Sequence, residues 1–355
     1  MNISALVGAS KCISLCFIVL LQGCSTLSYY HQAVTGQSEL LSKSRPIAEV
    51  LADRQLDPAV RSKLLVVQKA RAFAISELGL PDNDSYRDYA DLQRRYVMWS
   101  VFATPRFSLT PLQWCYPFVG CISYRNYFFR ADAQAYALKL ESEGYDVHLT
   151  GVPAYSTIGW FDDPVINTMM HWQDYDLVGT LFHEMAHQKS YIKNDTVFNE
   201  SLAKAIEQIG LQRWMKNTSQ QHRYVQYLID EQREKAFVGI VQDARKKLQG
   251  LYAQNTKPES GQFRAKLDIF RELRRNYIKL RKQWNGYDAY DHWILSGVNN
   301  AKVQSVATYY DYVPAFKYLL ALQGDDLSLF YKQIEKLMVM DRLERDEYLR
   351  KLGGQ

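Results

Sequence analysis

The sequence predicts an α+β protein that is predominantly α-helical, with a small β-sheet in its first half and a long helical hairpin in its C-terminal half. Residues 96–109 are rich in β-branched and aromatic side chains, which indicates strands. Most of the chain after residue 174 repeats its apolar residues every three or four positions, which indicates helices. A third observation, two histidines four residues apart on one predicted helix, predicts a metal site.

The size and composition of the chain set limits on its class. With 355 residues it can bury one large core or two smaller ones. Hydrophobic residues make up 47% and charged residues 23% of the sequence, a globular balance that excludes intrinsic disorder as the general state. The net charge of +5 is mild and evenly spread, so no nucleic-acid partner is expected.

Periodicity and turn residues place the individual elements. The first helical stretch stops at the turn residues Gly79-Leu80-Pro81, and the two hairpin helices are separated by the loop "NTKPESG". We expect two regions, a catalytic one with the sheet over 46–215 and a helical C-terminal one over 216–355. The expected elements are a helix within 46–80, strands within 96–109, a helix over 132–144, a strand pair within 145–161, and hairpin helices over 221–252 and 263–284.

The N-terminus has the pattern of an export signal. Lys11 precedes the apolar run "CISLCFIVLL", which is too short to span a bilayer comfortably and has the shape of a signal-peptide core. The following "LQGC" resembles the lipobox of bacterial lipoproteins, which implies cleavage before Cys24 and a lipid on that cysteine. Residues 1–23 are then the signal peptide and 24–45 a lipidated tether. An ordinary cleaved signal or a short anchor helix is the alternative.

The lipobox resemblance also implies a location. Ser25, rather than an aspartate, follows the cysteine, which suggests export to the outer membrane. We therefore expect a cell-envelope protein, held by its lipid at the periplasmic face of that membrane.

The cysteines support an oxidising compartment. Cys12 and Cys16 leave with the signal and Cys24 is acylated, so that Cys115 and Cys121 are the remaining pair. An even pair in such a compartment predicts a disulfide. As metal ligands, these two thiols would lack a second pair to complete a tetrahedral site.

The stretch "LFHEMAHQ", residues 181–188, carries the predicted chemistry. On a helix, His183 and His187 project from one face and can share a metal, while the opposite face is apolar and suited to burial. Glu184 flanks the metal, and its expected role is to take a proton from the attacking water and pass it to the leaving amine. The alternative is that this string occurs by chance on a structural helix.

A catalytic zinc ion needs a third protein ligand and an open fourth position. Glu200 in "FNESLA", at the start of the next predicted helix, is the first candidate. Glu207 is the reserve candidate and Asp195, in the connecting loop, the third choice. One Zn²⁺ per chain is expected. The histidines without a partner at ligand spacing are interpreted as surface or core residues: His148, His171 and His292.

"HEMAHQ" followed by "FNESLA" resembles the aminopeptidase branch of the gluzincin metallopeptidases, with its H-E-[ML]-A-H-Q and N-E-G-F-A signatures. The resemblance implies a zincin-like catalytic core, zinc ligation by His183, His187 and Glu200, and general-base catalysis by Glu184. Twelve residues separate His187 from Glu200, fewer than in that branch. Nearly the whole chain, including "RFSLTPLQWCYPFVGCISYRNYF" and "NNAKVQSVATYYDYVPAF", also resembles the bacterial putative aminopeptidase family of lipoprotein type.

The groups that would bind substrate are less clearly marked. In related aminopeptidases a glutamate in G-x-M-E-N holds the α-amine, and the corresponding segment 151–165 lacks that glutamate. Asp162 or Asp163 could replace it, although a solvated turn is the alternative. The oxyanion of the transition state is also stabilised by a hydrogen-bond donor opposite the metal. The candidates are Tyr309 and Tyr310 first, then Tyr312 and Arg125.

Together these features predict a zinc-dependent metallopeptidase, an aminopeptidase that releases N-terminal residues from peptides. The missing amine-binding glutamate keeps open a zinc endopeptidase or amidase that acts on envelope proteins or cell-wall peptides. A non-catalytic envelope scaffold with structural zinc is the second alternative. Glu184 argues against it, because a structural site needs no base and has four protein ligands.

Overall fold

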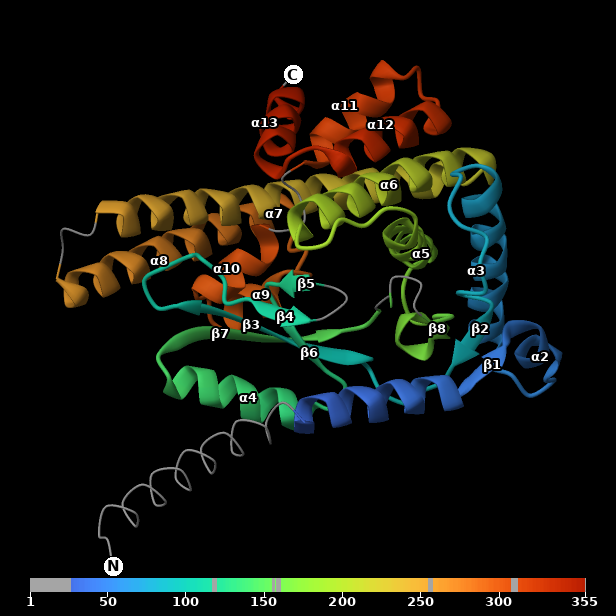
Figure 1. The fold of residues 1–355 in the computed structure, drawn as a ribbon, viewed down its shortest axis with the longest axis horizontal. Coiled ribbons are helices and arrows are strands. Elements are labelled where there is room, and N and C mark those ends of the chain that lie inside the picture. Colours follow the sequence, from blue (N-terminus) through green and yellow to red (C-terminus); the bar gives the residue numbers. More distant parts are fainter. Residues whose placement is uncertain are drawn as a thin grey trace, which may run out of the picture.

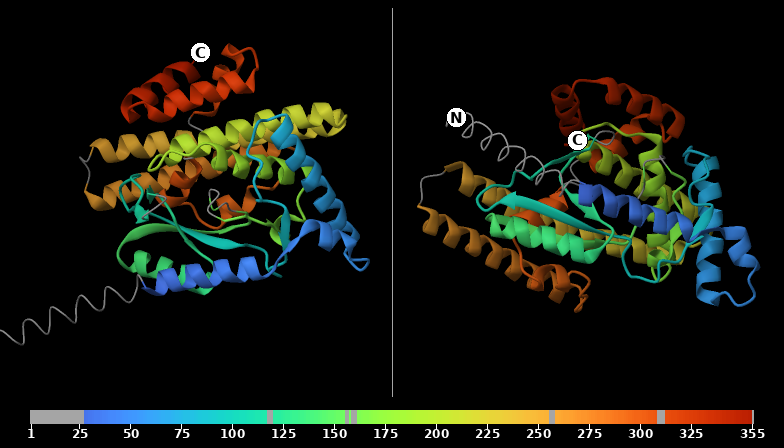
Figure 2. Two further views of the ribbon diagram at one scale, coloured as in Figure 1. Left: turned by 45° about the vertical axis from the view of Figure 1, so that its right-hand side comes forward. Right: turned by 60° about the horizontal axis from the view of Figure 1, so that its bottom comes forward.

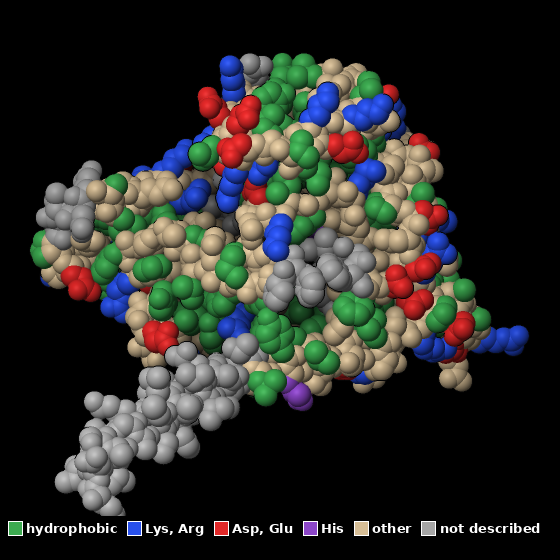
Figure 3. Space-filling view, in the orientation of Figure 1, with side chains coloured by type: hydrophobic (Ala, Val, Ile, Leu, Met, Phe, Trp, Pro, Cys, Tyr) green, Lys and Arg blue, Asp and Glu red, His purple; other side chains and the backbone are tan. Residues whose placement is uncertain are grey.

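The computed structural model describes residues 27–116, 120–154, 157, 161–254, 258–307 and 312–354 (Figure 1). Over these residues the protein is α+β and predominantly helical, which confirms the predicted class. None of the helices within this part of the chain is long and apolar enough to cross a membrane. Basic and acidic side chains are interspersed over the face seen in Figure 3.

The N-terminal segment differs from the predicted tether. Residues 27–42 form a helix packed on the rest of the fold, where Leu40 is fully buried and the Gln32 side chain accepts a hydrogen bond from the backbone N–H of Phe128 at 2.9 Å. Burial of this helix against the apolar cluster of Leu92 and Met98 explains why the segment is ordered rather than a loose linker.

The predicted helix within 46–80 is divided into two. α2 (Ile47–Ala52) ends before a turn, and α3 (Pro58–Ser76) begins at Pro58, in the first helical position where proline is tolerated. Asp57 caps α3 by accepting a hydrogen bond from the N–H of Ala59.

The main sheet is antiparallel, with strand order β6-β3-β7, and β7 is therefore one of its edges. The second sheet, in the order β1-β2-β8, leads into the metal-site helices. The predicted disulfide joins Cys115 to Cys121 across the β4–β5 hairpin. The strands are β1 (Ser44–Pro46), β2 (Asp88–Ala90), β3 (Met98–Pro105), β4 (Trp114–Tyr116), β5 (Gly120–Ile122), β6 (Arg125–Tyr127), β7 (Tyr145–Val152) and β8 (Val165–Ile166).

The second half of the chain is helical, and α7 with α8 forms the predicted long hairpin. Its own apolar cluster includes Phe237, Leu248 and Phe270. The helices are α4 (Arg130–Ser142) in the first half, then α5 (Asp174–Lys189), α6 (Thr196–Asn217), α7 (Gln221–Gln254), α8 (Glu259–Gln283), α9 (Asp291–Leu295), α10 (Asn300–Ala307), α11 (Val313–Leu322), α12 (Leu327–Val339) and α13 (Arg342–Gly353), with a 3₁₀ turn η1 (Asn167–Met169) before α5.

The elements are arranged in layers around the main sheet (Figures 1 and 2). The 27–42 helix and α4 lie on one side of it, and α10 packs on β3 and β7 from the other. α11 and α13 pack near α6, and their side chains Phe316 and Leu349 belong to the same core as Phe182 of α5. The expected boundary at residues 215 and 216 therefore does not divide that core.

Candidate metal centre

The metal-site histidines are held by the burial of α5. Leu181, Phe182 and Met185 on its apolar face are at most 2% exposed, as the amphipathic pattern predicts. His183 and His187 lie one turn apart on the other face, with ring centroids 4.9 Å apart and ring planes at 83°. The packing of the helix therefore fixes the direction in which both imidazoles point.

Glu200 reaches the histidines from the first turn of α6. Asp195 caps this helix by accepting from the N–H of Phe198, and the Asn199 side chain hydrogen-bonds both the N–H and the carbonyl of Ile192. These contacts fix the short connection between α5 and α6, and thereby place Glu200 against α5. The shorter spacing between His187 and Glu200 does not prevent the two helices from bringing their side chains together.

The three side chains converge on one point. Glu200 Oε2 lies 3.3 Å from His183 Nε2 and 3.7 Å from His187 Nε2, and one ligand atom from each residue lies within 4.8 Å of the others. Two ligand atoms held about 2.0–2.1 Å from a tetrahedral zinc ion stand about 3.4 Å apart. The two imidazole nitrogens and the carboxylate oxygen therefore fit the donor types and spacing of a zinc site.

Glu207 supports the site from behind. Its Oε2 lies 3.2 Å from His183 Nδ1, and its other oxygen accepts from Lys204 Nζ at 2.8 Å. A carboxylate on Nδ1 holds the imidazole in the tautomer that leaves Nε2 free to ligate. The structure thus places the reserve ligand candidate on the outer nitrogen of His183, and Glu200 at the inner one.

The electrostatics separate the two carboxylates near the histidines. Burial alone would raise the pKa of Glu200, but His187 and His183 outweigh it and lower that pKa strongly. Burial raises the pKa of Glu184, and the two histidines only partly oppose it. An ionised ligand beside a carboxylate with a raised pKa matches the division between a metal ligand and a proton acceptor.

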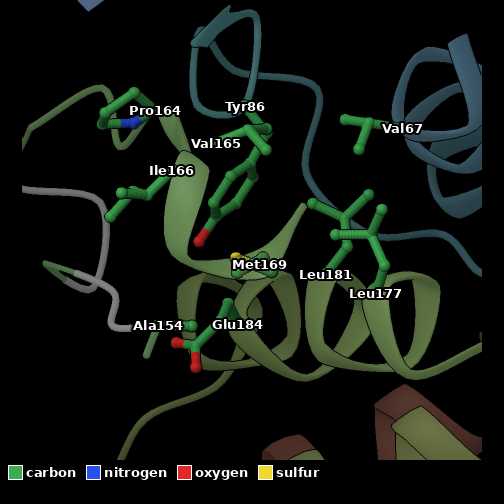
Figure 4. Close-up of a pocket in the computed structure, with 10 residues that line it drawn as sticks. All are labelled: Val67, Tyr86, Ala154, Pro164, Val165, Ile166, Met169, Leu177, Leu181 and Glu184. Atoms are coloured by element: carbon green, nitrogen blue, oxygen red, sulfur yellow. The ribbon is translucent and has the colours of Figure 1, made fainter. Parts of the chain in front are cut away.

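Glu184 also lines a small apolar cavity of about 10 Å³, room for about one water molecule (Figure 4). Tyr86 reaches into this cavity with a backbone φ of 62°, a left-handed conformation that is uncommon for an aromatic residue. Its N–H donates to the carbonyl of Asp163 at 2.6 Å. The sequence reasoning missed Tyr86, since no local pattern brings it to α5. The other lining residues are Val67, Ala154, Pro164, Val165, Ile166, Met169, Leu177 and Leu181.

The proposed amine anchors differ from each other. Asp162 is exposed, whereas Asp163 is only 2% exposed and its carboxylate accepts a hydrogen bond from the N–H of Thr157 at 2.8 Å. The hydrogen bond with Thr157 joins Asp163 to the backbone six residues earlier in the chain.

The remaining candidates lie elsewhere. The guanidinium of Arg125 stacks 3.9 Å from the ring centroid of Tyr29 and belongs to an aromatic cluster of the main sheet. Asp195, besides capping α6, forms a buried ion pair with Arg345 at 2.6 Å, so it is not directed to the metal ligands. Three predicted residues fall outside the described part of the chain: Cys24, Tyr309 and Tyr310.

Comparison with known proteins gives one family. A family model described as "Putative aminopeptidase" matches residues 28–349, which is most of the chain. No curated protein and no solved structure matches the chain.

Proposed function

The chain belongs to this family of putative aminopeptidases, and on that premise we propose that it is a zinc-dependent metallopeptidase that releases N-terminal residues from peptides. The observation that carries the proposal is the convergence of His183 Nε2, His187 Nε2 and a Glu200 oxygen at separations of 3.3 and 3.7 Å. Two adjacent helices that bring these groups together support a zincin-like catalytic core.

The residues of the chain divide the work. When bound, the zinc ion would polarise the scissile carbonyl and acidify the attacking water. Glu184 accepts a proton from that water and passes it to the leaving amine, and its raised pKa suits a group that must both gain and lose a proton. Glu207 accepts a hydrogen bond from Nδ1 of His183 and orients that imidazole.

Tyr309 and Tyr310 stay our candidates for the oxyanion donor. The backbone N–H of Tyr312 donates to the hydroxyl of Ser201 at 3.2 Å, and Ser201 follows Glu200 directly in the chain. The start of the described segment 312–354 therefore lies beside the residue that follows a metal ligand. For the substrate amine, the exposed Asp162 is the better candidate, because Asp163 already binds the backbone of its own loop.

We further propose that Cys24 carries a lipid that holds the protein at the periplasmic face of the outer membrane. The "LQGC" sequence supports this. Leu27, the first described residue of the packed helix, lies three positions after Cys24, and three residues span at most about 10 Å. The catalytic body would therefore stay close to the membrane surface.

Of two alternatives, the sequence supports the first and argues against the second. The absence of a glutamate like that of G-x-M-E-N in residues 151–165 favours a zinc endopeptidase or amidase. A non-catalytic scaffold would not need Glu184 beside the histidines. Hydrolysis of N-acetylated peptides would favour the first alternative, and metal binding with no hydrolysis of any peptide would favour the second.

The test uses the chain from Ser25 onward, loaded with zinc, and a panel of aminoacyl-arylamides with a free amine. We expect about one zinc per chain in the wild type and in Glu184→Gln, and turnover lower by about a hundred- to ten-thousand-fold in that variant. Glu335→Gln makes the same chemical change at an exposed position of α12 and serves as the matched control. A wild-type chain that binds no stoichiometric zinc would refute the proposal.

A further inference from the structure

β7 presents an unpaired edge. The carbonyl of Val147 accepts a hydrogen bond from the Asn299 side chain at 2.7 Å, so its backbone points away from β3. Ala103 lies opposite Val147 on β3. Its carbonyl likewise points away from β7 and accepts a hydrogen bond from the N–H of Leu112. Backbone N–H and C=O groups alternate in direction along an antiparallel strand. Those of Leu149 and Gly151 therefore also point away from β3. Within the described part of the chain, Val147 alone of these three has an outward hydrogen bond.

The outward groups of β7 form the floor of a long groove, which we call the β7 groove, with a volume of about 680 Å³. One wall is α4, which contributes Arg130 near its start and Glu141 near its end, a span of about 16 Å along the helix. The other wall is the segment from His292 to Lys302. An extended peptide of about five residues has the same length as the span of α4 between Arg130 and Glu141.

The charge of the groove is positive. Arg95 and Arg130 line it, are exposed and have no carboxylate partner among the described residues, whereas Glu141 is the acidic residue of the lining. Lys302 also lines it but is only 4% exposed, and its Nζ donates to Ser296 Oγ at 2.7 Å and to the carbonyl of Gly297 at 3.0 Å. Arg130 stacks over Trp99 at 5.0 Å and Lys302 lies 5.1 Å from the ring centroid of Trp293. These aromatic contacts hold the cations at the groove without neutralising them.

One end of the β7 groove lies close in the sequence to the cavity beside Glu184. Gly151 lines the groove, and Ala154, three residues later, lines the cavity that Glu184 shares. The Thr168 hydroxyl donates to the carbonyl of Pro153 at 2.5 Å and ties this stretch to the turn before α5. Three residues of extended backbone, about 10 Å long, therefore separate the lining of the groove from that of the cavity.

We propose that the β7 groove binds an acidic peptide segment in extended conformation, by strand addition to the outward backbone groups of Leu149 and Gly151. Outward N–H and C=O groups repeated every second residue match the backbone of an extended peptide. The exposed guanidinium groups of Arg95 and Arg130 favour carboxylate side chains. That the bound segment is part of the substrate, distant from the cleaved bond, rests on the proposed function, whereas the binding itself does not.

The test measures binding without catalysis. A fluorescein-labelled octapeptide with glutamate at alternate positions is titrated with Glu184→Gln in the presence of a chelator, and anisotropy is recorded. We expect at least about tenfold weaker binding for the same peptide with glutamine in place of glutamate, or with N-methyl groups on alternate backbone nitrogens. N-methylation removes backbone donors and leaves the charge unchanged, so it tests strand addition directly.

Two outcomes would overturn the proposal: equal binding of the acidic and glutamine peptides, or equal binding of the N-methylated peptide. Preferential binding of an acidic oligosaccharide such as oligogalacturonate would also overturn it and assign the groove to glycans. A further experiment uses the double variant Arg95→Gln/Arg130→Gln, in which we expect the affinity for the acidic peptide to fall about tenfold. Its matched control is Arg264→Gln/Arg274→Gln, which removes the same charge from exposed positions of α8.

Because the metal is absent from this assay, its result is independent of the proposed peptidase activity. Peptide binding in a chain without turnover would retain the groove and reject the enzyme. Turnover in a chain that does not discriminate between the peptides would reject the groove and retain the enzyme.

Discussion

Two polar hollows of opposite charge, the β7 groove and one formed by the metal-site helices with α7, differ in how their charges are compensated. The first, which we call the acidic hollow, has a volume of about 260 Å³ and lies among α5, α6 and α7. Glu207 and Glu234 both contact Lys204, Asp230 pairs with Arg233, and Glu231 pairs with Lys317. In the β7 groove, the cations Arg95, Arg130 and Lys302 have no such partners among the described residues.

The difference suggests different roles. A charge whose partner is built into the fold contributes to stability or to the tuning of a neighbour, as Glu207 does for His183. A charge that is held in place without a partner remains available to a ligand. Asp176 of the acidic hollow differs from these neighbours, because burial, followed by Asp230 and Glu207, raises its pKa to about 6 although Lys204 opposes the shift.

The largest effect is expected from removing the central cation of the acidic hollow. Lys204→Met leaves Glu207 and Glu234 without their counter-charge, and the side chain of Glu207 is only 17% exposed. We expect the free energy of unfolding to fall by about 3 kcal/mol in denaturant titrations. Lys235→Met, at a side chain that is 64% exposed, is the control and should change it by less than about 0.5 kcal/mol. If both variants lower the free energy of unfolding equally, the compensated charges of the acidic hollow do not stabilise the fold in the way proposed.

The next effect concerns metal affinity. Glu207→Gln keeps the shape of the side chain but weakens the acceptor on His183 Nδ1. We expect zinc affinity, measured by competition with a chromophoric chelator, to fall by about tenfold to a hundredfold. Glu231→Gln changes a carboxylate of the same hollow that does not contact a metal ligand, and it should leave the affinity unchanged. An unchanged affinity in Glu207→Gln would show that the acidic hollow does not tune the site.

Ionic strength should separate the two hollows further. Binding of an acidic peptide to the β7 groove depends on exposed cations, so it should weaken several-fold from low to moderate salt. Zinc affinity, which depends on direct ligands and on the buried Glu207, should change much less. Parallel titrations of peptide and metal at the same salt concentrations check this, and a salt-independent peptide affinity would contradict the electrostatic part of the groove proposal.

A further effect is a pH dependence of stability that starts at the groove. Burial first, then Lys302 and His292, lower the pKa of His148 to about 3. The unfolded chain binds a proton there below about pH 6.5 and the folded chain does not, so the free energy of unfolding falls as pH falls through that value. His148→Gln should show a smaller decrease between pH 7 and 4.5 in denaturant titrations. If the free energy of unfolding of His148→Gln falls as much as that of the wild type, other groups cause the pH dependence.

The sequence was most informative where a few adjacent residues determine the geometry. The four-residue spacing of His183 and His187 fixes their common face on any helix, and the structure brings them together with Glu200. Apolar periodicity likewise predicted the α7–α8 hairpin, because each helix buries one continuous stripe against the other.

Features that depend on distant parts of the chain could not be predicted. Whether Glu207 meets His183 at its inner or outer nitrogen depends on how α5 crosses α6. The β7 groove collects Arg95, Arg130 and Lys302 from a loop, from α4 and from α10, and no local pattern relates them. Pro58 was the one local signal that was overlooked, since it marks the start of α3 within a stretch predicted as a single helix.

The bare edge of β7 has a consequence for how copies of the protein behave toward each other. Edge strands with free backbone groups can pair between molecules and start aggregation. Two β7 edges that approach would bring Arg95, Arg130 and Lys302 of one copy against the same cations of the other. Repulsion between the exposed arginines would oppose such pairing, so the side chains that we propose for an acidic ligand would also limit self-association.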